Sequence, residues 1–207
     1  MSKELKYYHI DTCDLKNGTG IRVVLWVAGC SHHCKNCQNR FTWNHEQGLH
    51  FDTQIEEQLM DALRPSYIEG ITLSGGDPLY LENRDGVGKL VMRISKEMPK
   101  KSIWLYTGYD FICMDGKFVF RDGTDVFELP WLSCVDVIAD GKYDDEVRKD
   151  DLKKGRNVHW VGSSNQHVID VKKSLNAGGI VLFDDVAFRD DMERMPEMDI
   201  LRQLYKS

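Results

Sequence analysis

The chain has 207 residues, with 27 lysines and arginines against 33 aspartates and glutamates, which gives a formal charge of -6. No basic cluster is longer than a pair, and this argues against a nucleic-acid partner. The longest apolar run covers residues 23–28, far short of the ~20 residues of a membrane span, and residues 1–17 hold no apolar signal core, so we expect a cytoplasmic protein without a membrane partner.

Short β-rich runs alternate with helical stretches along the chain. The predicted strands cover residues 21–27, 71–73, 102–106, 135–139, 157–161 and 180–183. Thr53 and Glu56 form a capping-box pattern, which predicts a helix after the first strand. A second helix is predicted from an apolar stripe at i, i+3, i+4 and i+7, formed by Val87, Leu90, Val91 and Ile94. This alternation favours an α/β fold with a parallel sheet.

Two segments stand apart from this alternation. Residues 111–134 indicate a hairpin that turns at Asp122 and Gly123. After Asp184 the chain is acidic and ends in a short amphipathic pattern around Ile200 and Leu204. We therefore expect one domain over residues 1–183 and a C-terminal tail with a short helix over residues 184–207.

Three cysteines spaced C-x-x-x-C-x-x-C follow the first predicted strand: Cys30, Cys34 and Cys37. Three thiolates can hold three irons of a 4Fe-4S cluster and leave the fourth iron open for chemistry. A structural zinc site is the alternative, because a nearby histidine can supply a fourth ligand. The candidates for that ligand are His32, His33, His45 and His50. The other cysteines, Cys13, Cys113 and Cys134, are scattered and are interpreted as thiols without a metal.

Polar clusters follow five of the predicted strands. They cover residues 30–37, 74–78, 107–109, 140–142 and 162–166. The carboxyl ends of parallel strands share one edge of a sheet, so these loops are expected to converge on one site. Each cluster alone is also compatible with an ordinary turn. A zinc knuckle would not require their convergence, and the shared edge therefore favours a cofactor site.

The cysteine spacing together with Gly75, Gly76 and Asp77 resembles the radical S-adenosylmethionine enzymes. This resemblance implies a single-domain partial (incomplete) βα barrel. It also implies that the amino and carboxylate groups of S-adenosylmethionine chelate the open iron, and that one electron cleaves the cofactor to a 5'-deoxyadenosyl radical. Asp77 stands where many members of that superfamily carry glutamate, and the shorter acid keeps the charge.

The resemblance also suggests how the converging loops would bind the cofactor. Asp77 would receive the methionine amino group and Lys142 the carboxylate, whereas Asp140 would contact a ribose hydroxyl or a cation. The expected cofactor-binding residues are Asn36, Cys37, Gln38, Ser74, Gly75, Gly76, Asp77, Thr107, Asp140, Lys142, Ser163 and Asn165. No catalytic side chain is expected beyond the cluster and the cofactor.

Seven blocks taken together resemble a narrower family, the activating proteins of anaerobic ribonucleoside-triphosphate reductases. The blocks are residues 17–22, the cysteine triad, and residues 39–43, 73–79, 103–109, 140–143 and 162–166. The resemblance covers roughly residues 6–183 and departs at Thr19, usually proline, at Asn36, and over 111–134, more often a helix. It implies a glycyl radical installed on the reductase, and an electron donor such as a flavodoxin or ferredoxin.

Two alternatives stay open at this point. An activase of another glycyl-radical enzyme, such as pyruvate formate-lyase, would share the loop before Arg22 and the Thr42-Trp43 pair. The loops at residues 107–109 and 162–166 favour the reductase as partner. A zinc-stabilised binding protein would explain the cysteine triad but not the other four loops.

Overall fold

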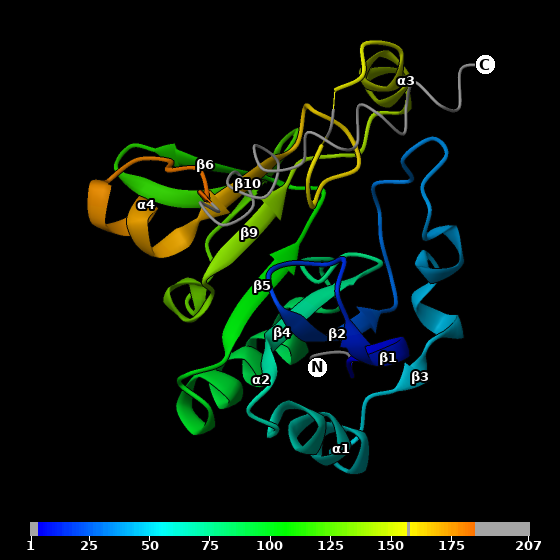
Figure 1. Cartoon of the computed structure of the whole chain (residues 1–207), viewed down its shortest axis with the longest axis vertical. Helices are drawn as coiled ribbons and strands as arrows, with labels where there is room; N and C mark the ends of the chain where they lie inside the picture. Colours follow the sequence, from blue (N-terminus) through cyan, green and yellow to red (C-terminus); the bar gives the residue numbers. More distant parts are fainter. Residues whose placement is uncertain (1–3, 157, 185–207) are drawn as a thin grey trace, which may run out of the picture.

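A computed structural model of the chain describes residues 4–156 and 158–184. Seven strands form one mixed sheet in the order β10-β9-β5-β4-β2-β1-β3 (Figure 1). Their bounds are β1 (Lys6–Asp14), β2 (Ile21–Val27), β3 (Leu49–His50), β4 (Ile68–Gly75), β5 (Ser102–Tyr106), β9 (Val137–Asp140) and β10 (His167–Asp170). The central strands β2, β4, β5 and β9 are parallel, whereas β1 and β10 pair antiparallel at the two sides. The structure is therefore α/β, with a mixed sheet.

The predicted strands agree with the sheet at its centre and differ toward its end. The runs at 21–27 and 102–106 match β2 and β5, and those at 71–73 and 135–139 overlap β4 and β9. A strand over 157–161 is wrong for its described residues, because Trp160 has a φ of 57° and its ring packs on Trp104 with centroids 5.0 Å apart. The run at 180–183 contributes one bridge, from Leu182 to Ile169.

The helices cover the sheet and connect its strands. They are α1 (Thr53–Leu63), α2 (Arg84–Glu97), α3 (Asp145–Lys153) and α4 (Val171–Ala177), with short 3-10 turns η1 (Arg40–Thr42), η2 (His45–Gln47) and η3 (Leu132–Cys134). The predicted cap of α1 is wrong by one residue, since the Asp52 carboxylate accepts from the backbone N–H of Ile55 at 2.9 Å. The predicted apolar stripe of α2 is confirmed and fully packed in the core. The expected C-terminal tail covers residues 184–207, and all of it after residue 184 lies outside the described residues.

A second, small antiparallel sheet follows β5. It contains β6 (Asp110–Met114), β7 (Lys117–Asp122) and β8 (Asp125–Phe127). The predicted hairpin is confirmed as β7–β8, where Gly123 takes a φ of 59° at the turn. A second hairpin turns at Asp115 and Gly116 and adds β6. The last residue of β7, Asp122, therefore stands at the tip of a short hairpin.

Alternate residues of the central strands face opposite sides of the main sheet. Leu25, Leu73 and Leu105 point to one side and form the hydrophobic core with α1 and α2. In Figure 1 these two helices lie together at the bottom of the view, whereas α3 lies at the top. The other side carries Trp26 and Tyr106 and is open to the cavities described below.

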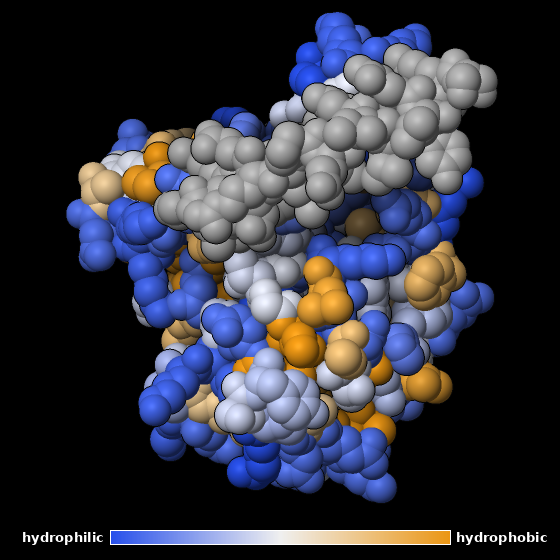
Figure 2. Space-filling view, viewed as in Figure 1, coloured by the Kyte–Doolittle hydropathy of each residue, from blue (hydrophilic) through white to orange (hydrophobic). Residues whose placement is uncertain are grey.

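The surface shown in Figure 2 is mostly hydrophilic, with hydrophobic residues gathered near its centre and smaller groups at the upper left and on the right side. Exposed apolar side chains of this extent are ordinary for a folded domain. Within the described residues, no helix is both long and apolar enough to cross a bilayer.

A buried arginine joins the three central strands near their amino ends. The Arg22 guanidinium on β2 donates to the Thr72 hydroxyl at 2.8 Å, to the Ile71 carbonyl at 2.6 Å and to the Ser102 carbonyl at 3.0 Å. It also donates to the Ser102 hydroxyl at 2.9 Å and to the Thr19 carbonyl at 3.2 Å. Burial lowers the pKa of Arg22 to about 10, so the group stays charged at neutral pH. One side chain thus ties the loop before β2 to β4 and β5.

We predict that Arg22→Met lowers the free energy of unfolding by at least about 2 kcal/mol, because buried acceptors lose their donors. Denaturant unfolding of the two proteins measures the difference. The matched control is Arg93→Met, since Arg93 pairs with Glu56, Glu57 and Glu97 at the surface. A loss in the control as large as in Arg22→Met would contradict the assigned role of burial.

Candidate functional site

The cysteine loop begins where β2 ends and is anchored at both of its ends. The N–H of Gly29 donates to the Thr42 carbonyl at 2.7 Å, and that of Cys30 donates to the Trp43 carbonyl at 3.1 Å. Between these anchors, His33 and Asn36 take left-handed φ angles of 49° and 57°. The loop therefore closes on itself and turns its thiols to one side.

Cys30, Cys34 and Cys37 are free thiols of intermediate exposure that line one cavity of about 140 Å³. Burial and the neighbouring Asp77 raise the pKa of Cys30 to about 12, and burial raises the pKa of Cys34. Both therefore carry protons in the absence of a metal, and a bound metal would hold the thiolates instead. The remaining cysteines, Cys13, Cys113 and Cys134, line neither this cavity nor the adjoining one.

The same cavity is lined by loops from each of the other central strands. Besides the cysteine loop, its walls include Ser74, Gly75, Gly76, Asp77, Tyr106, Thr107, Gly108, Ala139, Gly141, Tyr143 and Gln166. The loop at 162–166 was expected to follow a parallel strand. Instead it precedes the antiparallel strand β10. An antiparallel strand begins at the edge where its neighbour ends, so the loop still reaches the common site.

Gly75 and Gly76 bring the β4 loop against the cysteine loop. The N–H of Gly76 donates to the Val27 carbonyl at 2.9 Å, and a Cβ on Gly76 would lie 2.3 Å from the Gly29 carbonyl oxygen. Gly75 has a φ of 104°, a conformation that residues with a Cβ rarely adopt. These glycines are thus required for close packing between two backbones beside the cavity.

The Asp77 carboxylate is buried and connects three loops. It accepts from the N–H of Leu79 at 2.7 Å and from that of Gly108 at 2.8 Å. It also accepts from the Thr107 hydroxyl at 3.0 Å and lies 2.7 Å from Nε2 of His32. The acid that the sequence assigns to the cofactor is thus also the main link between the cysteine loop and the loop after β5.

Several expected cofactor residues bind neighbouring loops. The carboxylate of Asp140 accepts from the N–H of Phe111 at 2.8 Å and lies 3.1 Å from Nδ1 of His167, and burial raises its pKa. Asp140 lines neither cavity. The ammonium group of Lys142 pairs with Asp122 at 2.8 Å.

The remaining polar candidates also have protein partners. The Asn36 amide donates to Asp145 at 2.9 Å, and that of Asn165 donates to the Lys142 carbonyl at 2.8 Å. The Ser163 hydroxyl accepts from the N–H of Asp144 at 3.0 Å. Of the polar side chains expected at the cofactor, the structure brings Gln38, Ser74, Asp77 and Thr107 to the cavity walls.

A larger cavity of about 500 Å³ adjoins the cysteine cavity on the open side of the sheet. The two share Cys37, Asn39, Ser74, Tyr106, Tyr143 and Gln166 as lining residues. The hydroxyl of Tyr106 is buried there without a hydrogen-bond partner among the described residues, and burial raises its pKa. Its volume suits a small organic ligand, and the unsatisfied hydroxyl offers such a ligand a hydrogen bond.

Sequence reasoning did not assign Tyr106, Asp122 or Gln166 to this site, and it named His32 only as a candidate zinc ligand. Gln166 holds its loop closed, accepting from the N–H of Gly162 at 2.9 Å and donating to the Gly141 carbonyl at 2.7 Å. Tyr106 was hidden inside a predicted strand. The position of Asp122 depends on tertiary packing of the small sheet, which no local pattern reveals.

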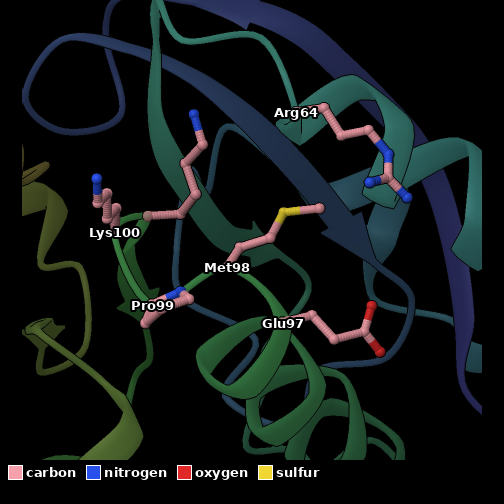
Figure 3. A pocket seen from close by; sticks show the side chains of 6 residues that line it. Arg64, Glu97, Met98, Pro99 and Lys100 are labelled. Atoms are coloured by element: carbon pink, nitrogen blue, oxygen red, sulfur yellow. The ribbon is translucent and has the colours of Figure 1, made fainter.

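A further cavity of about 460 Å³ lies at the opposite edge of the sheet, where β5 begins (Figure 3). It is lined by Arg64, Glu97, Met98, Pro99, Lys100 and Lys101. No cysteine or histidine is among these residues, so this cavity offers neither of the two metal-ligand types found beside the cysteine loop.

Comparison with known proteins agrees with this geometry. A family model described as a 4Fe-4S single cluster domain matches residues 16–169. The chain is 42% identical over 164 residues to the anaerobic ribonucleoside-triphosphate reductase-activating protein of Enterobacteria phage T4, with 79% of this chain and 93% of that protein covered.

Two bacterial proteins with the same name are also similar. That of Escherichia coli K12 is 35% identical over 166 residues, covering 79% of this chain and 97% of the relative. That of Haemophilus influenzae is 37% identical over 164 residues, covering 78% and 94%. Since the alignments span most of both partners, and the family model covers residues 16–169 with the cysteine loop and the loops that meet it, the chain belongs to the family of anaerobic ribonucleoside-triphosphate reductase-activating proteins.

Proposed function

We propose that the chain is a radical S-adenosylmethionine activase that installs a glycyl radical on an anaerobic ribonucleoside-triphosphate reductase. The observation that carries the proposal is the meeting of three free thiols of one loop with four other loops around joined cavities. The names of the relatives support the reductase as the target. The mixed sheet with four parallel central strands is compatible with the partial βα barrel that we propose for the fold.

The donor set suits a 4Fe-4S cluster with one open iron. Cys30, Cys34 and Cys37 would supply three thiolates, the usual protein ligands of such clusters. When bound, the cluster and S-adenosylmethionine supply the one-electron cleavage that yields a 5'-deoxyadenosyl radical. We propose a flavodoxin or ferredoxin as the source of that electron. The match to a 4Fe-4S domain favours iron over the zinc alternative.

The side chains around the cavities would bind and orient the cofactor. Tyr106 has a buried hydroxyl to donate, and Ser74 stands beside it where the two cavities meet. Asp77 in the cavity wall and Lys142 on the loop after β9, outside the lining of both cavities, carry opposite charges that match the ammonium and carboxylate of an amino acid. The larger cavity, lined by Trp26 and Trp160, would exclude water from the adenosyl group.

A carbon radical is so reactive that it must contact only its target. The position of the cavities indicates what kind of molecule that target is. The cavities lie between loops at one edge of a domain of modest size. A protein loop carrying the target glycine would close such a site, whereas a free small molecule would require a lid from the enzyme itself. This reasoning favours a macromolecular substrate.

We predict that alanine in place of Cys30, Cys34 or Cys37 removes the cluster, because two thiolates leave two irons without protein ligands. Replacing Cys13, Cys113 or Cys134 in the same way is expected to leave the cluster intact. Iron and acid-labile sulfide are measured on the six anaerobically reconstituted variants. Full iron in any of the first three variants would sink the ligand assignment.

The partner is tested with the protein, S-adenosylmethionine, a reductant and the cognate anaerobic ribonucleotide reductase under anaerobic conditions. We expect a glycine-centred radical on the reductase, seen as a doublet by electron paramagnetic resonance. Pyruvate formate-lyase in place of the reductase is the control and should remain without a radical. A radical on the lyase alone would move the assignment to the sister class of activases.

A further inference from the structure

Four titratable side chains form a continuous row beside the cysteine loop. Asp77 lies 2.7 Å from Nε2 of His32, and Nδ1 of the same imidazole lies 3.1 Å from Asp122. The other carboxylate oxygen of Asp122 lies 2.8 Å from the ammonium group of Lys142. The row runs from the carboxylate of Asp77 to the ammonium group of Lys142 through an imidazole and a second carboxylate.

The two inner members of this row each have partners on both sides. The ring nitrogens of His32 lie 2.7 Å from Asp77 and 3.1 Å from Asp122. Asp122 has His32 on one side and the ammonium group of Lys142 on the other. The hydrogen bond from Lys142 lowers the pKa of Asp122, so this carboxyl group is ionised at neutral pH. Asp122 thus places a carboxylate directly against Lys142.

Asp122 reaches this position from the small sheet, outside the loops that follow the parallel strands. The β7–β8 hairpin that carries it is fastened along β8, where Asp125, the cross-strand partner of Asp122, pairs with Arg84 at 3.1 Å and the Arg84 guanidinium lies 3.3 Å from the ring centre of Phe127. The side chain of Asp122 is 29% exposed and that of His32 only 2%. The hairpin tip therefore places the Asp122 carboxylate at the edge of the site.

The two ends of the row offer the partners that a free amino acid takes. An α-ammonium group pairs with an acid such as Asp77, and an α-carboxylate pairs with a base such as Lys142, where Asp122 lies in this structure. We propose that Asp122 occupies the place of the cofactor's carboxylate at Lys142, and that it sets the affinity for S-adenosylmethionine by competing for that lysine. This inference rests on the proposed function, since it assigns Lys142 to the methionine end of the cofactor.

The proposed competition predicts the direction in which the affinity for S-adenosylmethionine changes. Binding of the cofactor requires Asp122 to give up Lys142, so removing the negative charge favours binding. Because both partners are partly exposed, Asp122→Asn is expected to tighten binding by about two- to fivefold. A residue with a purely structural role would weaken binding or leave it unchanged when replaced.

Calorimetric titration of S-adenosylmethionine into the anaerobic, cluster-loaded protein tests the inference. Asp125→Asn is the matched control, because it removes the same charge from the same hairpin but contacts Arg84 and not Lys142. We expect this control to bind like the wild type. In a Lys142→Gln background, Asp122→Asn should bring no further gain, since the contested lysine is absent.

Each outcome of this titration has one meaning. Unchanged or weaker binding by Asp122→Asn, or an equal gain from Asp125→Asn, overturns the competition while the proposed function stands. A gain of the same size in the Lys142→Gln background also overturns it. If the loaded wild-type protein binds no S-adenosylmethionine, the proposed function itself fails and this inference fails with it.

Discussion

The buried carboxylate of Asp77 is the interaction on which the geometry of the site depends. It binds backbone N–H groups of its own loop and of the loop after β5, and through His32 it holds the cysteine loop. A buried carboxylate with fewer donors would be costly, so these loops stabilise it as much as it positions them. The cysteine thiols thus face a fixed wall, and the carboxylate that fixes this wall also lines the cavity.

Parallel strands explain why so many loops meet at this point. β2, β4, β5 and β9 all end at one edge, and the Arg22 guanidinium ties the first three together near their beginnings. The core lies on one side of the sheet with α1 and α2, which leaves the other side for the larger cavity. One face of the sheet therefore packs into the hydrophobic core, and the other face borders the cavity that would bind a ligand.

The sequence predicted the parts of this arrangement that depend on local patterns. Short β-rich runs identified β2 and β5, and the cysteine spacing with Gly75 and Gly76 indicated where the site lies. Hydrogen bonds and ion pairs that depend on tertiary packing were not predictable. Asp140 turns to Phe111 and His167, and Asp122 arrives from a hairpin whose turn was predicted but whose destination was not. Trp160 belongs to a β-rich run that was predicted to form a strand. Its backbone has a left-handed φ, and its ring packs on Trp104 instead.

The central claim is that the chain's site directs a radical to one glycine of its partner and removes hydrogen from that carbon directly. The most direct measurement uses a reductase whose glycine residues carry deuterium, mixed anaerobically with the loaded protein, S-adenosylmethionine and a reductant. Mass spectrometry of the 5'-deoxyadenosine is expected to find deuterium in the nucleoside in step with radical formation. A glycyl radical accompanied by unlabelled 5'-deoxyadenosine would contradict the account.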